Sequence, residues 1–303
     1  MRPTGLFWGF AAWTVLRAGV AVGQACCAGG AAYQPARLKL HEDWLVGVSV
    51  QASDQLGSAG HNGSYIPNPP GDGEQDYTES LLATVRVFER GQIGLSVPFL
   101  QSNRYVPGTT QFGGGIGDIS FTARWDFLYS NESAHFPGIS LLGGVTAPTG
   151  IPPESASLPL GANTTGLGSW QGALGLELER TFFNGAVVSA TGLVTENFVR
   201  HVDGLEEQLG TLFSGLLAAG WVFPDEAAVA ATFTYSDSLD TKLNGVAQPM
   251  SERQVNTVGI AGGLPINDEW RLQATAFWDL PVLGRNHPSD GIGGSFTVIR
   301  AFL

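Results

Sequence analysis

Charged side chains recur at every second position inside several apolar segments of this chain. Arg124 and Asp126 stand two residues apart in "ISFTARWDFL", and Glu177 and Glu179 have the same spacing in "LGLELER". Side chains two residues apart lie on one face of a β-strand. Such charges can line a pore and select the solutes that cross it, or they can pair and fill a narrow barrel, and we keep both alternatives. The lumen-lining candidates are Arg86, Asp118, Arg124, Asp126, Glu177, Glu179, Arg271 and Asp279.

Catalytic chemistry has weaker support. The chain has five His, and "GHNGS" at residues 60–64 is the one segment that puts His61 close to Ser64. A Ser nucleophile and its His base must be held together by rigid elements, whereas this segment is a glycine-rich loop. Cys26 and Cys27 are adjacent and are the two cysteines of the chain, so they lack metal-site spacing. We expect no enzyme, no catalytic residue, no metal and no cofactor.

The elements that must position the charges are strands. The chain has 303 residues, 42 Gly and 14% charged residues, whereas an ordinary soluble domain has about 25% charged residues. Outside the N-terminus no apolar run reaches the length of a transmembrane helix. From Glu42 onward, apolar and polar residues alternate in repeated segments of about ten residues. These segments are residues 42–53, 77–88, 92–101, 116–128, 138–147, 169–179, 185–195, 210–223, 227–236, 254–264, 269–279 and 292–303.

The number of segments and the lengths of their connections predict the fold class. Twelve is even, as a single-chain bacterial barrel requires, and long connections alternate with short ones. We therefore expect an all-β chain that forms one transmembrane antiparallel up-and-down β-barrel of about 12 strands, with long extracellular loops and short periplasmic turns. In the turn "ERG" at residues 89–91, we expect Gly91 to be left-handed and Phe88 to pair with Gln92.

Aromatic residues at the ends of the apolar faces indicate which face meets lipid. Trp270 and Trp278 are eight residues apart, which is about 27 Å along a strand and about 20 Å along a barrel axis at the usual tilt. This is close to the spacing of two aromatic girdles. The alternative is a soluble β-sandwich with a core of aromatic residues. The barrel interpretation places the polar faces inward and predicts a girdle of Trp44, Trp125, Phe127, Trp170, Trp270 and Trp278.

The N-terminus has the features of an export signal. Arg2 precedes an apolar stretch, and Gly23 and Ala25 are small residues at a spacing that suits signal peptidase. The alternative is a mis-assigned start upstream of the true signal. We expect a signal peptide at residues 1–25, a short periplasmic N-terminal segment at 26–41 and the outer-membrane barrel at 42–303.

The charge of the exported chain bears on its partners. The 15 basic residues include Arg2 and Arg17, and residues 1–25 hold no acid, so cleavage leaves 13 basic against 27 acidic residues. An acidic surface repels phosphate, so we expect no nucleic-acid partner.

Three stretches resemble a known family of Gram-negative outer-membrane barrels. They are "GQIGLSVPFL" at residues 91–100, the residues Gly115, Gly117 and Asp118 followed by Arg124, and "VTAPTG" at residues 145–150. The sequence resembles the meta-pathway phenol-degradation family, whose members are described as transporter-like. The resemblance implies an outer-membrane channel or transporter for small hydrophobic or aromatic molecules in a Gram-negative bacterium. Its partners would be outer-membrane lipid, a small-molecule solute and the barrel assembly machinery, with an oligomeric state that the sequence does not indicate.

The last strand departs from the usual pattern. The chain ends in "TVIRAFL", with Phe302 before a final Leu303, whereas barrels commonly end in an aromatic residue. Its faces are also ambiguous, because Arg300 places even residues in the lumen while Ser295 and Thr297 place odd residues there. Two alternative functions stay open: a structural or adhesive barrel with a plugged lumen, and, with less support, an outer-membrane hydrolase.

The barrel interpretation predicts a specific behaviour of the purified mature chain. We expect it to require detergent and to migrate faster unboiled than boiled on a denaturing gel, because a closed barrel has no unpaired strand edge and resists unfolding. Gel mobility with and without boiling measures this, and a monomer that is soluble without detergent would contradict the barrel.

Overall fold

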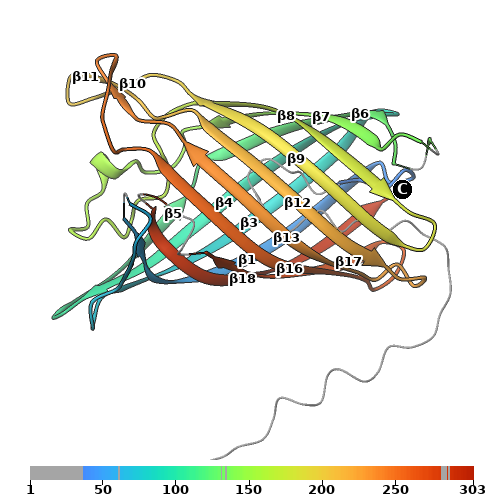
Figure 1. Cartoon of the computed structure of the whole chain (residues 1–303), viewed down its shortest axis with the longest axis horizontal. Helices are drawn as coiled ribbons and strands as arrows, with labels where there is room; N and C mark the ends of the chain where they lie inside the picture. The colour runs from blue at the N-terminus through green and yellow to red at the C-terminus, as the bar shows by residue number, and fades with distance from the viewer. Residues whose placement is uncertain (1–36, 61, 131, 134, 281–284, 286) are drawn as a thin grey trace, which may run out of the picture.

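Twelve long antiparallel strands close into one barrel (Figure 1). The computed structural model describes residues 37–303 except 61, 131, 134, 281–284 and 286. Each strand pairs with its neighbours, and the first strand pairs with the last from Trp44↔Phe302 to Ala59↔His287. The strands in sheet order are β1 (Trp44–Ala59), β3 (Gly73–Phe88), β4 (Gly91–Val106), β6 (Ile119–Leu128), β7 (Gly138–Ala147), β8 (Gln171–Thr181), β9 (Ala186–Asn197), β12 (Leu212–Val222), β13 (Ala228–Ser238), β16 (Arg253–Pro265), β17 (Trp270–Asp279) and β18 (His287–Phe302).

The predicted fold class is confirmed. Every barrel strand overlaps the segment predicted for it. The strands β1, β3 and β4 are longer than predicted, because their polar ends continue the ladder beyond the apolar stretch that marked them in the sequence. Among the described residues, no helix is long and apolar enough to cross a membrane.

The long connections gather at one end of the barrel, which we call the loop end; we call the other end the turn end (Figure 1). The loop-end connections carry the remaining short elements. These are β2 (Tyr65–Pro67), β5 (Thr109–Ile116), the 3₁₀ helix η1 (Pro153–Ser155), β10 (Arg200–Val202), β11 (Leu205–Gln208), β14 (Lys242–Leu243) and β15 (Val246–Ala247). The last four form a small sheet that joins two different loops. The strands β8 and β9, by contrast, are joined at the turn end by residues 182–185.

The two faces of each strand meet different surroundings. On β6, Thr122, Arg124 and Asp126 are buried, whereas Phe121 and Phe127 are 52% and 55% exposed. In a closed barrel the buried face is the inner one, so the apolar side chains point outward. The apolar face of the strand therefore looks away from the lumen, as the barrel interpretation requires.

The turn between β3 and β4 differs from the prediction. Glu89 and Arg90 form a two-residue turn, Phe88 pairs with Gly91, and Arg86 pairs with Gln92 across a bulge. The expected pairing of Phe88 with Gln92 was wrong, and Gly91 is not left-handed. The bulge adds one residue to β3, which restores the inward face that a bare two-residue turn would have reversed.

The predicted segment 116–128 spans a second irregularity, between β5 and β6. Both strands pair with β4, but in registers that differ by one residue: Phe99↔Ile116 in β5 and Ser96↔Ser120 in β6. Gly117 and Asp118 lie at the offset, and the Gly117 N–H donates to the Pro98 carbonyl at 2.8 Å. Odd residues of β5 therefore point inward, whereas even residues of β6 do.

The structure shows which residues of β18 point into the lumen and which point outward. Ser295 and Thr297 point inward, where their hydroxyls lie 2.7 Å from Thr275 and 2.8 Å from Ser49. Arg300 lies on the outer face, and its guanidinium stacks on the rings of Trp270 and Phe302 at 5.5 and 4.7 Å. An Arg at the edge of the apolar band can therefore lie on the outer face. For this reason Arg300 did not indicate in the sequence which face of the strand points inward.

Adjacent positions on β6 test the face assignment. Ala123→Arg would point a guanidinium at hydrocarbon and destabilise the folded barrel by about 2–4 kcal/mol at mid-bilayer. Thr122→Arg points inward between two glycines, Gly94 and Gly144, which leave space beside it. We expect the first variant to give less folded protein in membranes and the second to assemble normally. A larger assembly defect in Thr122→Arg would reverse the two faces.

Candidate functional site

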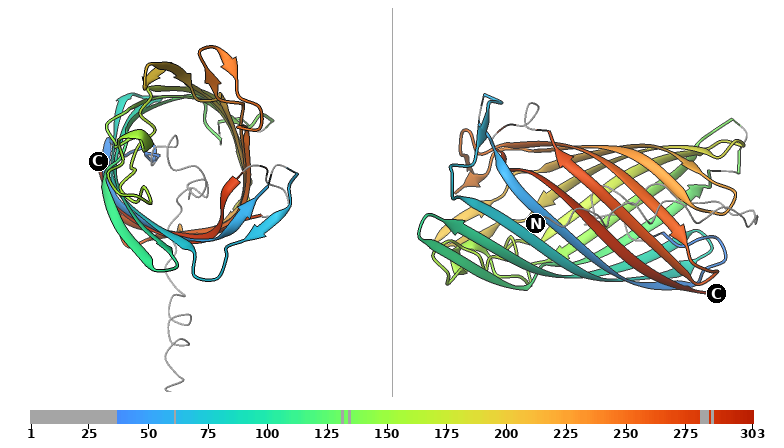
Figure 2. Two further views of the ribbon diagram at one scale, coloured as in Figure 1. Left: turned by 90° about the vertical axis from the view of Figure 1, so that its left-hand side faces the viewer. Right: turned by 90° about the horizontal axis from the view of Figure 1, so that it is seen from below.

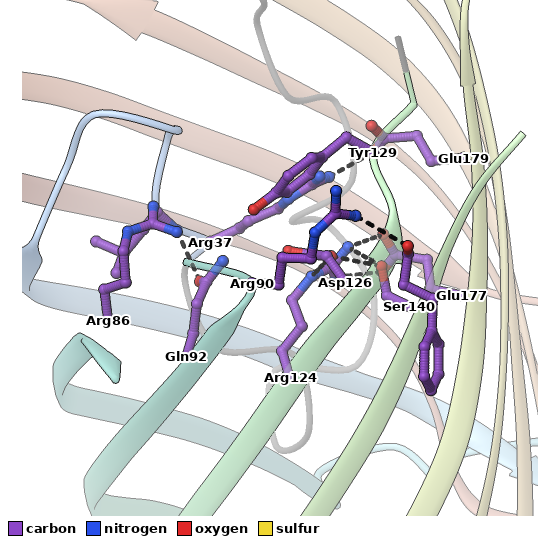
Figure 3. Close-up of polar contacts among 12 residues, drawn as sticks. Arg37, Arg86, Arg90, Gln92, Arg124, Asp126, Tyr129, Ser140, Glu177 and Glu179 are labelled. Atoms are coloured by element: carbon purple, nitrogen blue, oxygen red, sulfur yellow. Dashed lines mark hydrogen bonds and ion pairs between the residues drawn. The ribbon is translucent and has the colours of Figure 1, made fainter. Parts of the chain in front are cut away.

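A buried network of charges lies on the inner wall across β6, β7 and β8 (Figure 3). Arg124 donates to both carboxylate oxygens of Glu177, at 3.0 and 2.9 Å, and its Nε donates to Asp126 Oδ1 at 2.8 Å. Ser140 accepts from Arg124 Nη2 at 2.7 Å and donates to Asp126 Oδ1 at 2.6 Å. The three charged side chains are at most 5% exposed. A bidentate geometry of this kind offsets part of the cost of burying these charges.

The network continues through the chain that precedes β1. Glu179, next but one to Glu177, pairs with Arg37 at 3.0 Å. The carbonyl of Arg37 accepts a hydrogen bond from Arg271 Nη2 on β17 at 3.1 Å, and Arg271 Nη1 binds Glu42 at 2.7 Å. Side chains from β8 and β17, far apart in the sheet order, are thus joined by one short segment.

This segment, Arg37–Asp43, lies across the turn end of the lumen. Arg86 of β3 donates to the carbonyls of Lys39 and Glu42, at 2.6 and 3.0 Å. The Leu38 N–H donates to Gln92 of β4 at 3.0 Å. Lys39 also pairs with Glu226, in the turn between β12 and β13. Because these partners are distributed around the barrel, the segment obstructs the opening at this end.

An apolar contact fixes the same segment to the seam of the barrel. Leu38 is 3% exposed and packs with Leu45, Ile299 and Ala301, which belong to the first and last strands. The sequence predicted a short periplasmic N-terminal segment at residues 26–41, of which residues 26–36 lie outside the described residues. The hydrogen bonds of residues 37–43 could not be predicted from the sequence, because these residues show no periodicity.

Asp118 has a different environment from the other candidates. Its two carboxylate oxygens accept the N–H groups of Gly150, at 2.9 Å, and Leu167, at 2.8 Å. These residues lie near the two ends of the loop from Pro148 to Gly168. Thr149 donates to the Gly117 carbonyl at 2.6 Å and accepts from the Ile119 N–H at 3.1 Å. Two of the three stretches that carried the family resemblance, around Asp118 and Gly150, thus meet in one joint.

The loop held by Asp118 packs against the inner side of β5 and lies inside the loop-end mouth (Figure 2). Thr165 donates to the Ile116 carbonyl at 2.8 Å, and the Leu160 N–H donates to Gln111 at 2.8 Å. A Cβ at Gly113 would lie 2.8 Å from the backbone of Ala162, so a side chain there would push the loop away. The lumen is therefore narrowed at both ends.

The remaining predicted residues are distributed along the barrel. Asp279 on β17 accepts a hydrogen bond from Thr257 at 2.6 Å, away from the network. All six aromatic candidates are outward and exposed; Trp44 stacks on Phe302, with ring centroids 3.7 Å apart. Their place at a lipid interface stays a prediction. His61, Cys26, Cys27 and residues 1–25 lie outside the described residues, and Ser64 donates to Asn62.

A tyrosine adjoins the network at the turn end (Figure 3). The hydroxyl of Tyr129 donates to the Glu89 carbonyl at 2.7 Å. Burial, and secondarily the charge of Asp126, raises the pKa of Tyr129 above its usual value, so it stays a donor at neutral pH. Across the described part of the chain, no group of three His, Cys, Asp or Glu side chains is placed to hold a metal ion.

The closed sheet, with an apolar outer wall and a polar inner wall, defines a transmembrane β-barrel of the outer-membrane class. The family model described as "Putative MetA-pathway of phenol degradation" matches residues 39–297, and the chain belongs to this family.

Comparison with one solved structure supports this fold. The COG4313 outer membrane channel from Pseudomonas putida F1 is 16% identical, with a TM-score of 0.67 over 87% of this chain and 97% of that chain. The translocator domain of autotransporter NalP from Neisseria meningitidis is less similar. It is 12% identical, with a TM-score of 0.49 over 86% and 88% of the two chains. A search among curated sequences gives no match.

The joint at Asp118 generates a prediction. Asp118→Ala removes two charge-assisted hydrogen bonds, each worth about 1.5–3 kcal/mol, so the loop should open more than tenfold more often. Cleavage after Glu154 by a Glu-specific protease, located by mass spectrometry, should speed up accordingly while the barrel stays folded. The control is Asp268→Ala, in an exposed turn at the other end. Equal cleavage rates in the two variants would show that Asp118 does not hold the loop.

Proposed function

We propose that this chain is an outer-membrane channel that passes small hydrophobic or aromatic molecules in a Gram-negative bacterium. The observation that carries the proposal is the segment Arg37–Asp43, which is hydrogen-bonded across the turn end of a polar lumen. A pore reduced in this way admits small solutes and excludes large ones. The family description supports an aromatic solute, and the similarity to an outer membrane channel of P. putida supports a channel.

The charges at the constriction support an uncharged solute. Ten charged side chains there bind the segment Arg37–Asp43 or bind one another. Five of them are basic and five are acidic. A pore whose fixed charges are paired has no strong preference for ions of one sign. The ten are Arg37, Lys39, Arg86, Arg124, Arg271, Glu42, Asp126, Glu177, Glu179 and Glu226.

A structural or adhesive barrel without transport is the second candidate. The obstruction at the turn end also favours this candidate, because a permanently bound segment would block flux. The small sheet β10–β11–β14–β15 gives the loop end an ordered surface that could contact a partner. We propose no enzymatic activity. The chain would contact outer-membrane lipid and reach it through the barrel assembly machinery.

Arg86 provides the test, because it binds the segment without belonging to it. Arg86→Ala removes hydrogen bonds to two carbonyls of the segment, so the segment should leave the lumen about tenfold more often or more. We expect more frequent openings in planar bilayers and faster entry into liposomes of phenyl glucoside, an uncharged aromatic solute that protein-free bilayers admit slowly. The control is Arg90→Ala in the same hairpin. The guanidinium of Arg90 binds the Glu132 carboxylate and the Phe127 carbonyl, and not the segment Arg37–Asp43.

The two candidate functions give different outcomes. A channel passes phenyl glucoside in the wild type and passes it faster in Arg86→Ala. If neither the wild type nor Arg86→Ala admits phenyl glucoside faster than protein-free liposomes do, while both give the folded, heat-sensitive band, the chain is a plugged scaffold.

A further inference from the structure

The outer wall of the barrel carries a groove that the channel function does not use. The groove has a volume of about 610 Å³ and crosses β8, β9, β12 and β13 close to the turn end. Its walls are mostly outward apolar side chains, among them Leu178, Val188, Ala190, Leu217, Ala219 and Phe233. Glu179 and Ser189, which alternate with the outward residues along β8 and β9, are buried and also line the groove.

The groove results from the order of large and small residues across neighbouring strands. One row of cross-strand partners runs Leu178↔Ala190↔Leu217↔Phe233. The next row toward the turns runs Arg180↔Val188↔Ala219↔Ala231. Alanines between larger side chains lower the outer surface locally, and this leaves an apolar depression that faces the hydrocarbon.

A positive charge is fixed at the turn-side limit of the groove. Arg180 shares the outer face of β8 with Leu178 and also lines the groove. Its Nη1 donates to the carbonyls of Ser133 and Phe136, at 2.9 and 2.6 Å, and its guanidinium lies 6.0 Å from the centre of the Phe182 ring. These two carbonyls orient the guanidinium at the edge of the groove.

We propose that this groove binds one phospholipid of the leaflet next to the turns, with an acyl chain in the groove and the phosphate on Arg180. Arg180 is the last residue but one of β8. The aromatic side chains of Trp221 and Phe223 are exposed at the same end of the barrel. The guanidinium therefore lies at the height of these two residues, where aromatic side chains meet the membrane interface. Planar guanidinium groups pair strongly with phosphate oxygens. The volume is within the range of about 300–1,000 Å³ typical of small-molecule sites.

The positive charge of Arg180 favours a phospholipid as the occupant of the groove. A second copy of the chain would have to set its own apolar wall against a groove that ends in a cation, whereas a phospholipid supplies both an apolar chain and an anion. The proposal rests on the membrane location but is independent of transport.

Native mass spectrometry of the full mature protein in detergent tests the site, with phosphatidylglycerol as the probe. The wild type should retain one lipid. Arg180→Gln removes the phosphate partner, and Ala219→Leu fills the groove, so each should weaken retention about tenfold or more. Ala123→Leu makes the same increase in side-chain volume on the outer face of β6, outside the groove, and should retain lipid as the wild type does.

Equal retention in all four proteins would overturn the proposal, as would equal binding of diacylglycerol, which lacks the phosphate. Dimers that Ala219→Leu abolishes, without any lipid adduct, would identify a second copy as the occupant instead. Gel mobility with and without boiling is measured on the same samples. Loss of the mobility shift in the wild type would mean that the membrane location itself is wrong, whereas failure of the lipid site leaves the shift intact.

Discussion

The pairing of every backbone N–H and C=O within the chain is the requirement on which this structure depends. In hydrocarbon no water replaces a missing partner, and an unpaired strand edge would expose a row of such groups. The ladder between β1 and β18 removes the edge, from Trp44↔Phe302 onward. Once the sheet is closed, its two faces become an inner and an outer wall, and the alternation of polar and apolar residues assigns each side chain to one of them.

That alternation explains how much of the fold could be predicted from the sequence. A side chain's face depends on its parity within one strand, which is local information, so the strands and the outward-facing residues of β6 and β17 could be derived. Offsets between strands are not local. The bulge near Arg86 and the shift at Gly117 each change a register by one residue, and neither changes the composition of the segments around it.

The candidate site was predicted in part for the same reason. Parity placed Arg124, Asp126 and Glu177 on inner faces, but whether inward charges line an open pore or pair depends on distances between strands. The structure pairs them, and it uses Arg86, Glu179 and Arg271 to hold residues 37–43, a segment with no pattern of its own. Asp118 was also placed with these charges, yet its carboxylate serves two backbone N–H groups of a loop.

The position of Leu38 has a consequence for the order of folding. This side chain is buried against Leu45 from the first strand and Ile299 and Ala301 from the last, and those strands are neighbours after the ends of the sheet have met. The site that receives Leu38 therefore does not exist in an unclosed sheet. Residues 37–43 precede the barrel in the chain, but they reach their final place after the last strand has joined the first, so the segment that obstructs the lumen is seated at the end of assembly.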